Sequence, residues 1–185
     1  MAQQPTAPAK VGASGAAIPD NKGDLNFNYA YMRITAMKSG VYNSYPSGWQ
    51  FNAAKRMARG ISLMGSFGGY IGDNIDSIDV RVAQKPAKYY LYQGGVRFSN
   101  RSNALASGKH MFLKPFAEVL FGGANDNATQ MNHFSALTVG GGVDLQLSQK
   151  FSIRVQGGLP MFFFFGPVHL GSQFQVGVVV PFHKQ

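Results

Sequence analysis

The chain contains no cysteine, so neither a disulfide framework nor a thiolate metal site is available to it. Charged residues are also scarce, at 14% of the sequence, well below the quarter that is usual for a soluble domain. Long apolar runs are missing as well, and no stretch approaches the roughly 20 residues that a membrane-spanning helix needs. These absences exclude a disulfide-stapled protein and a helical membrane protein, and they make an ordinary soluble domain a poor fit.

Basic residues outnumber acidic ones, which gives a formal net charge of +9 at pH 7. A basic excess is typical of proteins that bind nucleic acid, anionic membrane surfaces or acidic polymers. Here the basic residues are scattered, and the only tight cluster is Lys55, Arg56 and Arg59. Nucleic-acid binding needs a basic patch or stripe, so we expect no nucleic-acid partner.

What the sequence has in abundance is an alternation of large apolar residues with small or polar ones. In the segment 173–182, Phe174, Val178 and Phe182 share one face of an extended strand, and Gln173 and Gln175 lie on the other. The same alternation recurs from residue 25 to residue 182, and no helical period is sustained there. The pattern therefore predicts strands along most of the chain.

Residues 1–23 contain few large apolar side chains, so we expect an extended, low-complexity N-terminal tail. Residues 24–185 form one predicted domain of about eight strands. The predicted strands cover 25–36, 49–55, 60–71, 89–99, 111–123, 133–148, 151–165 and a last segment that ends at Phe182. We expect an all-β fold, namely a single eight-stranded antiparallel up-and-down β-barrel preceded by the tail.

The polarity of such a barrel can be read in two ways. A soluble barrel puts its apolar face inside, whereas a membrane barrel puts that face against lipid and fills its lumen with polar groups. An eight-stranded barrel has a narrow interior, which could not contain this many Phe, Tyr, Leu and Trp side chains. We therefore expect an apolar exterior and a polar lumen.

The predicted exterior face carries no charged residue, in accord with the cost of about 2–4 kcal/mol for a charge facing the middle of a bilayer. Aromatic residues near the strand ends are typical of the girdles at membrane interfaces. We expect a lipid- or subunit-facing belt made of Phe27, Tyr29, Trp49, Phe51, Tyr90, Tyr92, Phe121, Phe163, Phe165, Phe174 and Phe182. The run Phe162 to Phe165 either joins a girdle or contacts another subunit, since two of its four rings fall on the lumen face.

The predicted lumen face carries charges of both signs. Because a buried charge needs a partner, we expect Glu118 and Asp144 to pair with Arg97, Lys114 or Arg154. These five residues form the predicted lumen network. It either plugs the lumen with satisfied charges or provides a path for protons or ions.

Connection lengths predict which end of the barrel faces outward. The longer connections (37–48, 72–78 and 123–132) are expected to be extracellular, and the tight ones (56–59 and 148–150) to be periplasmic turns. The linker 99–109 is too long for this rule, and the last connection is too short. An even strand number places both termini on the periplasmic side.

Signals for catalysis or metal binding are sparse. None of the four histidines lies at a metal-ligand spacing. Asp73, Asp76 and Asp79 lack the closing Glu of an EF-hand loop, so the alternative to a solvated loop is a weak cation site that bridges lipopolysaccharide. The glycines at 140–142 lie inside a predicted strand, where small residues let a lumen close. We expect no catalytic residue, no metal and no cofactor, and so no enzyme.

Three segments resemble a known family: FLKPFAEVLFGGA (112–124), LTVGGGVDLQLSQKFSIRV (137–155) and the last strand, which closes on Phe182. They are similar to the small OmpA/OmpX-like barrels, the "outer membrane protein β-barrel domain" family. The resemblance covers about 25–182, and its clearest parts are Pro115-Phe116, the glycines and Asp at 140–144, and Arg154. It implies an eight-stranded barrel in the outer membrane of a Gram-negative-type bacterium.

The sequence leaves three functions open. The first is an outer-membrane barrel with a structural, adhesive or minor-pore role, whose partners are the lipid bilayer and lipopolysaccharide. The second is a secreted barrel subunit that assembles with copies of itself, through residues 1–23 and the aromatic belt, into an extracellular tube or filament. The third is a soluble lipocalin-like carrier.

Overall fold

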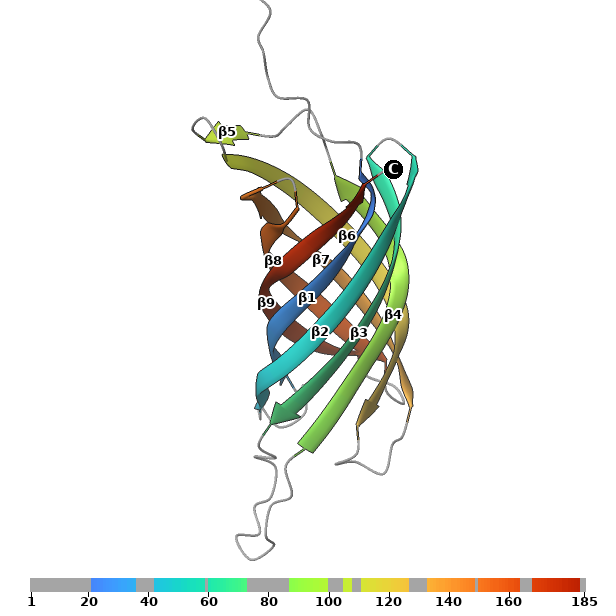
Figure 1. Ribbon diagram of the computed structural model, residues 1–185. Helices are drawn as coiled ribbons and strands as arrows, with labels where there is room; N and C mark the ends of the chain where they lie inside the picture. The colour runs from blue at the N-terminus through green and yellow to red at the C-terminus, as the bar shows by residue number, and fades with distance from the viewer. Residues whose placement is uncertain are drawn as a thin grey trace, which may run out of the picture.

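The computed structural model describes residues 21–35, 42–58, 60–72, 87–99, 105–107, 111–126, 133–148, 150–163 and 168–183. These residues form one antiparallel sheet, and the pairing of β4 with β6 closes it into a barrel (Figure 1). The strands are β1 (Asn21–Thr35), β2 (Tyr42–Ala58), β3 (Ile61–Gly72), β4 (Ala87–Ser99), β5 (Leu105–Ser107), β6 (Met111–Asp126), β7 (Phe134–Gln146), β8 (Ser152–Phe163) and β9 (Val168–His183).

The predicted fold is confirmed: eight long strands make a closed antiparallel barrel. Neighbours in the ring follow the chain order, and β1 pairs with β9. The ninth strand, β5, has three residues and pairs with β6 at one end of the barrel. It lies inside the linker 99–109, which the sequence did not predict to contain a strand. No helix within the described residues is long and apolar enough to cross a membrane.

Two strands begin well before the positions that the sequence predicts. β1 begins at Asn21, within the range expected for the tail, and β2 begins at Tyr42 rather than at Trp49. The segment before Trp49 contains Pro46, which suggests a loop. In the structure a register shift opposite Ala30 and Met32 accommodates it, because a bulge tolerates a residue that has no N–H to donate.

The two ends of the barrel differ. At the terminal end, the start of β1 lies beside the end of β9, and tight turns join β2 to β3 and β7 to β8 (Figure 1). Gly60 holds the first turn with a φ of 80°, a left-handed conformation that favours glycine. In the second turn the Ser148 hydroxyl accepts hydrogen bonds from the N–H groups of Lys150 (3.1 Å) and Phe151 (3.2 Å). The connections 36–41, 73–86, 127–132 and 164–167 join strands at the other, distal end.

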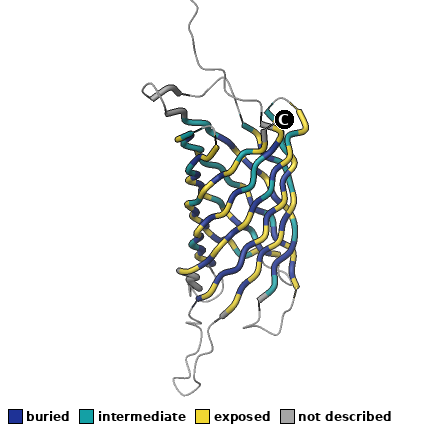
Figure 2. Tube along the Cα trace, viewed as in Figure 1, coloured by how far each residue is buried: buried dark blue, intermediate teal, exposed yellow. Residues whose placement is uncertain are grey.

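Burial alternates along every long strand, as the tube in Figure 2 shows. On β1, Phe27 is 61% exposed and its neighbour Asn28 is fully buried. On β9, Phe174 and Val178 are about half exposed, whereas Gln173 and Gln175 are buried. The predicted inversion is therefore present: large apolar side chains cover the exterior, and amides and charges fill the interior.

Candidate functional site: the lumen and the outer belt

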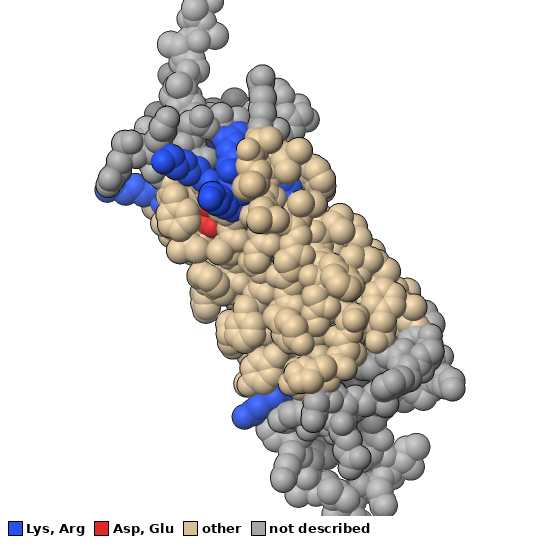
Figure 3. Space-filling view, turned by 90° about the vertical axis from the view of Figure 1, so that its right-hand side faces the viewer, with Lys and Arg blue, Asp and Glu red and all other residues tan. Residues whose placement is uncertain are grey.

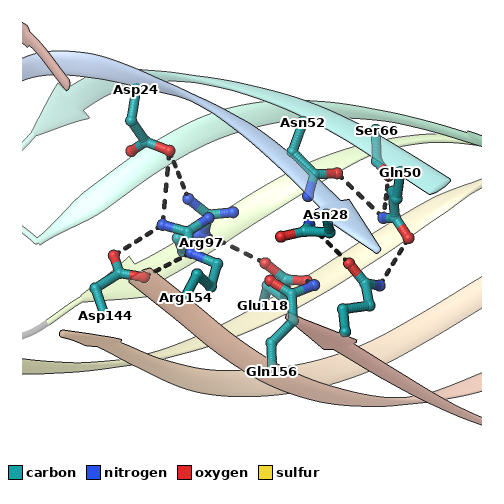
Figure 4. Close-up of polar contacts among 11 residues, drawn as sticks. Asp24, Asn28, Gln50, Asn52, Ser66, Arg97, Glu118, Asp144, Arg154 and Gln156 are labelled. Atoms are coloured by element: carbon teal, nitrogen blue, oxygen red, sulfur yellow. Dashed lines mark hydrogen bonds and ion pairs between the residues drawn. The ribbon is translucent and has the colours of Figure 1, made fainter. Parts of the chain in front are cut away.

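Near the terminal end, a network of ion pairs crosses the lumen; we call it the charged layer (Figure 4). Arg97 Nε donates to Glu118 Oε2 at 3.2 Å, and Arg97 Nη1 donates to Asp24 Oδ1 at 3.1 Å. Arg154 binds Asp144 with two parallel hydrogen bonds, from Nε at 2.6 Å and from Nη2 at 2.8 Å. Arg154 also lies 3.6 Å from Asp24, so Asp24 bridges the two arginines.

The two arginines and Glu118 of the charged layer are almost completely removed from solvent, whereas the side chains of Asp24 and Asp144 are 24% and 18% exposed. Arg97 and Glu118 are each 3% exposed and Arg154 is 1% exposed. Both guanidinium groups lie over the ring of Phe116, with Cζ atoms 4.9 and 4.6 Å from its centroid. Gly142 is the cross-strand neighbour of Phe116, and a Cβ atom there would collide with the backbone of Val155 and Gln156. The arrangement supplies charge pairing and cation–π contacts to groups that would otherwise be buried at high cost.

A cavity of about 110 Å³ opens beside this network, and it is lined by Arg97, Arg154, Lys114 and Asp144 among other residues. Arg97 Nη2 and Arg154 Nη1 are buried and have no protein acceptor. The cavity has room for several water molecules, which are the usual partners for such groups. The nearby charges of both signs roughly balance, so the layer has no strong preference for cations or anions.

The middle of the lumen is filled by hydrogen-bonded amides, centred on Gln50. Its Nε2 donates to Asn52 Oδ1 (3.1 Å) and Ser66 Oγ (2.5 Å). Its Oε1 accepts from Gln173 (2.8 Å) and Gln175 (2.7 Å). These contacts link β2, β3 and β9 across the barrel, so the amides hold the walls together while they exclude a continuous water column.

The distal third of the lumen is apolar, a feature that the predicted polar lumen did not include. Tyr70, Tyr89, Phe134 and Phe162 form an aromatic plug in which successive ring centroids are 5.6–6.3 Å apart. Tyr70, Tyr89 and Phe162 are at most 1% exposed. The plug is completed by Ala30, Met32, Ile34, Leu91, Ala124 and Ala136. The lumen is therefore filled from the charged layer to the plug.

Glycines on the lumen wall make room for the plug. A Cβ atom at Gly48 would lie 2.4 Å from the ring of Tyr70, and one at Gly171 would lie 2.9 Å from Pro160 and 3.3 Å from the ring of Phe162. These rings lie flat against the backbone of neighbouring strands only because no side chain stands there. Phe162 thus points into the lumen and Phe163 points outward.

On the exterior, the belt residues lie where the sequence places them. Phe27, Tyr29 and Phe121 are about 60% exposed, and the others are about 40–50% exposed: Trp49, Phe51, Tyr90, Tyr92, Phe163, Phe174 and Phe182. Phe165 lies outside the described residues. Figure 3 shows a band without charged side chains between basic residues at the terminal end and a single basic side chain at the distal end.

Several aromatic residues on the exterior form a girdle near the distal end. Trp49 and Phe67 have ring centroids 5.4 Å apart, and Phe67 stacks on Tyr90 at 6.5 Å. Tyr29 is the cross-strand neighbour of Trp49. Trp and Tyr are the residues that favour membrane–water interfaces, so this girdle is suited to one boundary of a bilayer.

The structure brings four of the five predicted network residues together, namely Arg97, Glu118, Asp144 and Arg154, and places Lys114 on the wall of the adjoining cavity. Sequence reasoning missed Asp24, because it lies where the tail was expected to end. Its signal is positional: it alternates with Leu25 at the start of β1, on the face that also carries Asn26 and Asn28.

No described residues form a group of three or more His, Asp or Glu that could hold a metal ion. Asp73, Asp76, Asp79 and His110 lie outside the described residues. His133 Nδ1 lies 3.4 Å from the Tyr92 hydroxyl on the exposed surface. This contact does not supply the nucleophile–base–orienter geometry of a catalytic site.

No family model and no curated protein sequence matches the chain, but solved structures do. The crystal structure of Ail, the attachment invasion locus protein of Yersinia pestis, is similar with a TM-score of 0.54 at 15% identity, over 88% of this chain and 99% of Ail. Neisserial surface protein A (NspA) gives a TM-score of 0.60 at 11% identity, over 87% of this chain and 97% of NspA.

These neighbours are eight-stranded outer-membrane β-barrels and are not enzymes. At such low identity the similarity shows the fold alone. The resemblance to the OmpA/OmpX-like family is thus supported at the level of the fold, and no finer relationship follows from it.

Proposed function

We propose that this chain is a bacterial outer-membrane barrel, non-enzymatic and non-conducting, that acts through its surface in a structural or adhesive role. The observation that carries the proposal is the belt: over the described strands, the exterior between Lys55 at the terminal end and Lys88 at the distal end carries no charge. In water, an apolar surface of this extent would drive association. In a bilayer it faces lipid, and the pairing of β4 with β6 closes the barrel so that no open sheet edge faces the lipid.

The filled lumen favours a surface role over the minor-pore role. A conducting barrel needs a continuous polar path, and here the path would end at the rings of Tyr70, Tyr89 and Phe162. An ion would have to leave water to pass them. The charged layer therefore acts as a seal rather than as part of an ion or proton path.

An adhesive role draws on the position of the longer connections. Most of those at the distal end are longer than the two tight turns at the terminal end, where the third connection, 100–110, is long and contains β5. Longer loops are typical of the extracellular side. The name of Ail describes attachment and invasion, which makes adhesion a concrete form of the proposal. Lipopolysaccharide is the partner that this location would offer.

The soluble-carrier alternative does not fit the geometry. A lipocalin-like carrier needs an apolar interior cavity for its ligand. Here the described residues line a cavity within the barrel of about 110 Å³ that contains several charged side chains, and the inward apolar side chains of the plug pack against one another without such a cavity. Assembly with copies of itself uses the same belt as membrane insertion, so experiment has to separate these two.

The test starts from the full chain, recovered without detergent and with detergent, and added to lipid vesicles. The proposal predicts recovery only with detergent, insertion into vesicles, protease resistance of the barrel, and faster gel migration of the unboiled protein. Electron microscopy of detergent-free material supplies the contrary outcome. Regular tubes or filaments that contain this chain, together with failure to insert into vesicles, would replace the membrane role with the assembly role.

A further inference from the structure

A groove interrupts the belt on the outer surface of β1, β2 and β3 at the terminal end. Its volume is about 930 Å³, with small residues at its floor, Leu63 and Phe182 at its sides and Lys22, Lys55 and Arg56 at its rim. A second hollow of about 440 Å³ shares Ala53 and Gly65 with it and continues to Gly94 on β4. Together they make one depression that runs from the basic rim into the apolar band.

The groove exists because three small outward residues are aligned across neighbouring strands. Ala53 pairs with Gly65, and Gly65 pairs with Gly94. A Cβ atom at Gly65 would meet nothing within 4 Å, so the hollow is not filled by neighbouring side chains. Large residues on either side, Phe51 and Phe67 distally and Leu63 terminally, stand above this floor.

The rim of the groove is positively charged. Lys22 and Lys55 are exposed, and no acidic residue is among those that line the groove in the described part of the chain. The nearest acid along β1, Asp24, points into the lumen and binds Arg97 and Arg154. Lys55 lies two residues from Ala53 on the same face of β2, about 7 Å along the strand. A cationic site therefore lies next to an apolar hollow. The distance between the two is similar to the distance between the phosphate of a phospholipid and the start of its acyl chains.

We propose that this groove binds an anionic phospholipid, with its phosphate between Lys22 and Lys55 and one acyl chain over Ala53 and Gly65. The inference rests on the proposed membrane location. The tight turns lie at this end, which places the groove in the leaflet that faces the periplasm. A second copy of the chain paired symmetrically at this surface would bring its own Lys55 toward the first one, so charge complementarity favours a lipid over a dimer.

The test uses the full chain folded in a neutral detergent and native mass spectrometry with added phosphatidylglycerol or phosphatidylethanolamine of identical acyl chains. The wild-type protein is expected to retain one phosphatidylglycerol in preference to phosphatidylethanolamine. Each basic residue near an anionic surface contributes about a fivefold preference at low salt. Lys55→Gln should lower the preference by about that factor, and a Lys22→Gln/Lys55→Gln variant should nearly abolish it.

Two matched controls separate the groove from general electrostatics and general hydrophobicity. Lys150→Gln removes the same charge from an exposed position in the β7–β8 turn at the same end, and it should leave the preference unchanged. Gly65→Leu fills the groove without changing charge, so it should remove the retained lipid. Gly157→Leu adds the same side chain to an exposed outward position on β8 where a Cβ meets only one backbone atom, at 3.8 Å, and it should have no effect.

Equal retention of the two lipids by the wild-type protein would overturn the inference, and so would equal losses in Lys55→Gln and Lys150→Gln. A dimer in place of the lipid adduct, abolished by Gly65→Leu, would reassign the groove to self-association. These outcomes leave the membrane role intact, because insertion into vesicles is scored first and separately. Failure of that first step would remove both proposals.

Discussion

At the scale of residues, the central feature is the connection of Arg97 and Arg154 to three acids inside a narrow barrel. An isolated buried charge is strongly unfavourable, and here each guanidinium group has two carboxylate partners within 4.0 Å. The ring of Phe116 supports both cations. The charged residues of the layer therefore stabilise one another, and loss of one of them leaves its partners buried without a counter-charge.

Replacing Arg154 by Met keeps most of the side-chain volume but leaves Asp144 without its bidentate partner. We expect Arg154→Met to lower the free energy of unfolding by about 3–5 kcal/mol. Urea titration of protein folded in vesicles, followed by fluorescence of the single tryptophan, Trp49, measures it. Lys150→Met, an exposed position, should change stability little. Adding Asp144→Asn to Arg154→Met should recover part of the lost unfolding free energy. Equal stability of Arg154→Met and Lys150→Met would contradict the role of the layer.

A charge placed on the belt tests which medium the exterior faces. Val139 is 44% exposed near the middle of β7, so Val139→Arg should destabilise the inserted protein by about 2–4 kcal/mol, whereas Arg at the interface costs about 0–1 kcal/mol. Leu147→Arg, just beyond the terminal end of β7, is the matched control. The same vesicle titration measures both variants. If the two substitutions cost the same, the exterior does not face a bilayer.

At the scale of elements, strand faces follow from alternation, and strand ends do not. The sequence predicts correctly which side chains of a strand face outward and which face the lumen, as with Phe174 and Gln175 on β9. It places the start of β2 seven residues late, because the segment with Pro46 has the composition of a loop, and only the pairing with β1 extends it into a strand. It also omits β5, whose three residues are strand-like only through their pairing with β6.

The plug allows a comparison of two adjacent phenylalanines on β8. Phe162 is fully buried among Tyr89 and Phe134, whereas Phe163 is 41% exposed on the belt. Phe162→Ala should cost about 3–5 kcal/mol through the cavity that it leaves. Phe163→Ala loses only part of a lipid contact, and it should cost clearly less. Unfolding midpoints in vesicles measure both, and a larger loss in Phe163→Ala would refute the inward position of Phe162.

At the scale of the whole molecule, the barrel is a closed tube with a seal near one end and a plug at the other. We expect the wild-type protein to show no steady conductance in planar bilayers. The variant Tyr70→Ala/Tyr89→Ala/Phe162→Ala, if it still gives the heat-modifiable gel band of a folded barrel, should also stay closed, because the amides around Gln50 and the charged layer still fill the lumen. If it does not fold, Phe162→Ala alone provides the measurement. Steady ion flow through the wild-type protein would contradict the sealed lumen.

The sequence by itself determined the inverted polarity of this protein. Alternation assigns each side chain to one of two faces, and the size of the apolar set exceeds what an eight-stranded interior can hold. The narrow lumen, the uncharged belt and the pairing of opposite charges across the interior all follow from that one local pattern.

Only the tertiary structure decided which lumen residues meet. Asp24 and Arg97 are 73 positions apart in the chain, and the rings of the plug come from β3, β4, β7 and β8. Strand register and tilt bring such residues to the same height in the barrel, and period-two alternation carries no information about height. The charged layer, the plug and the basic groove are therefore properties of the closed barrel and not of any single strand.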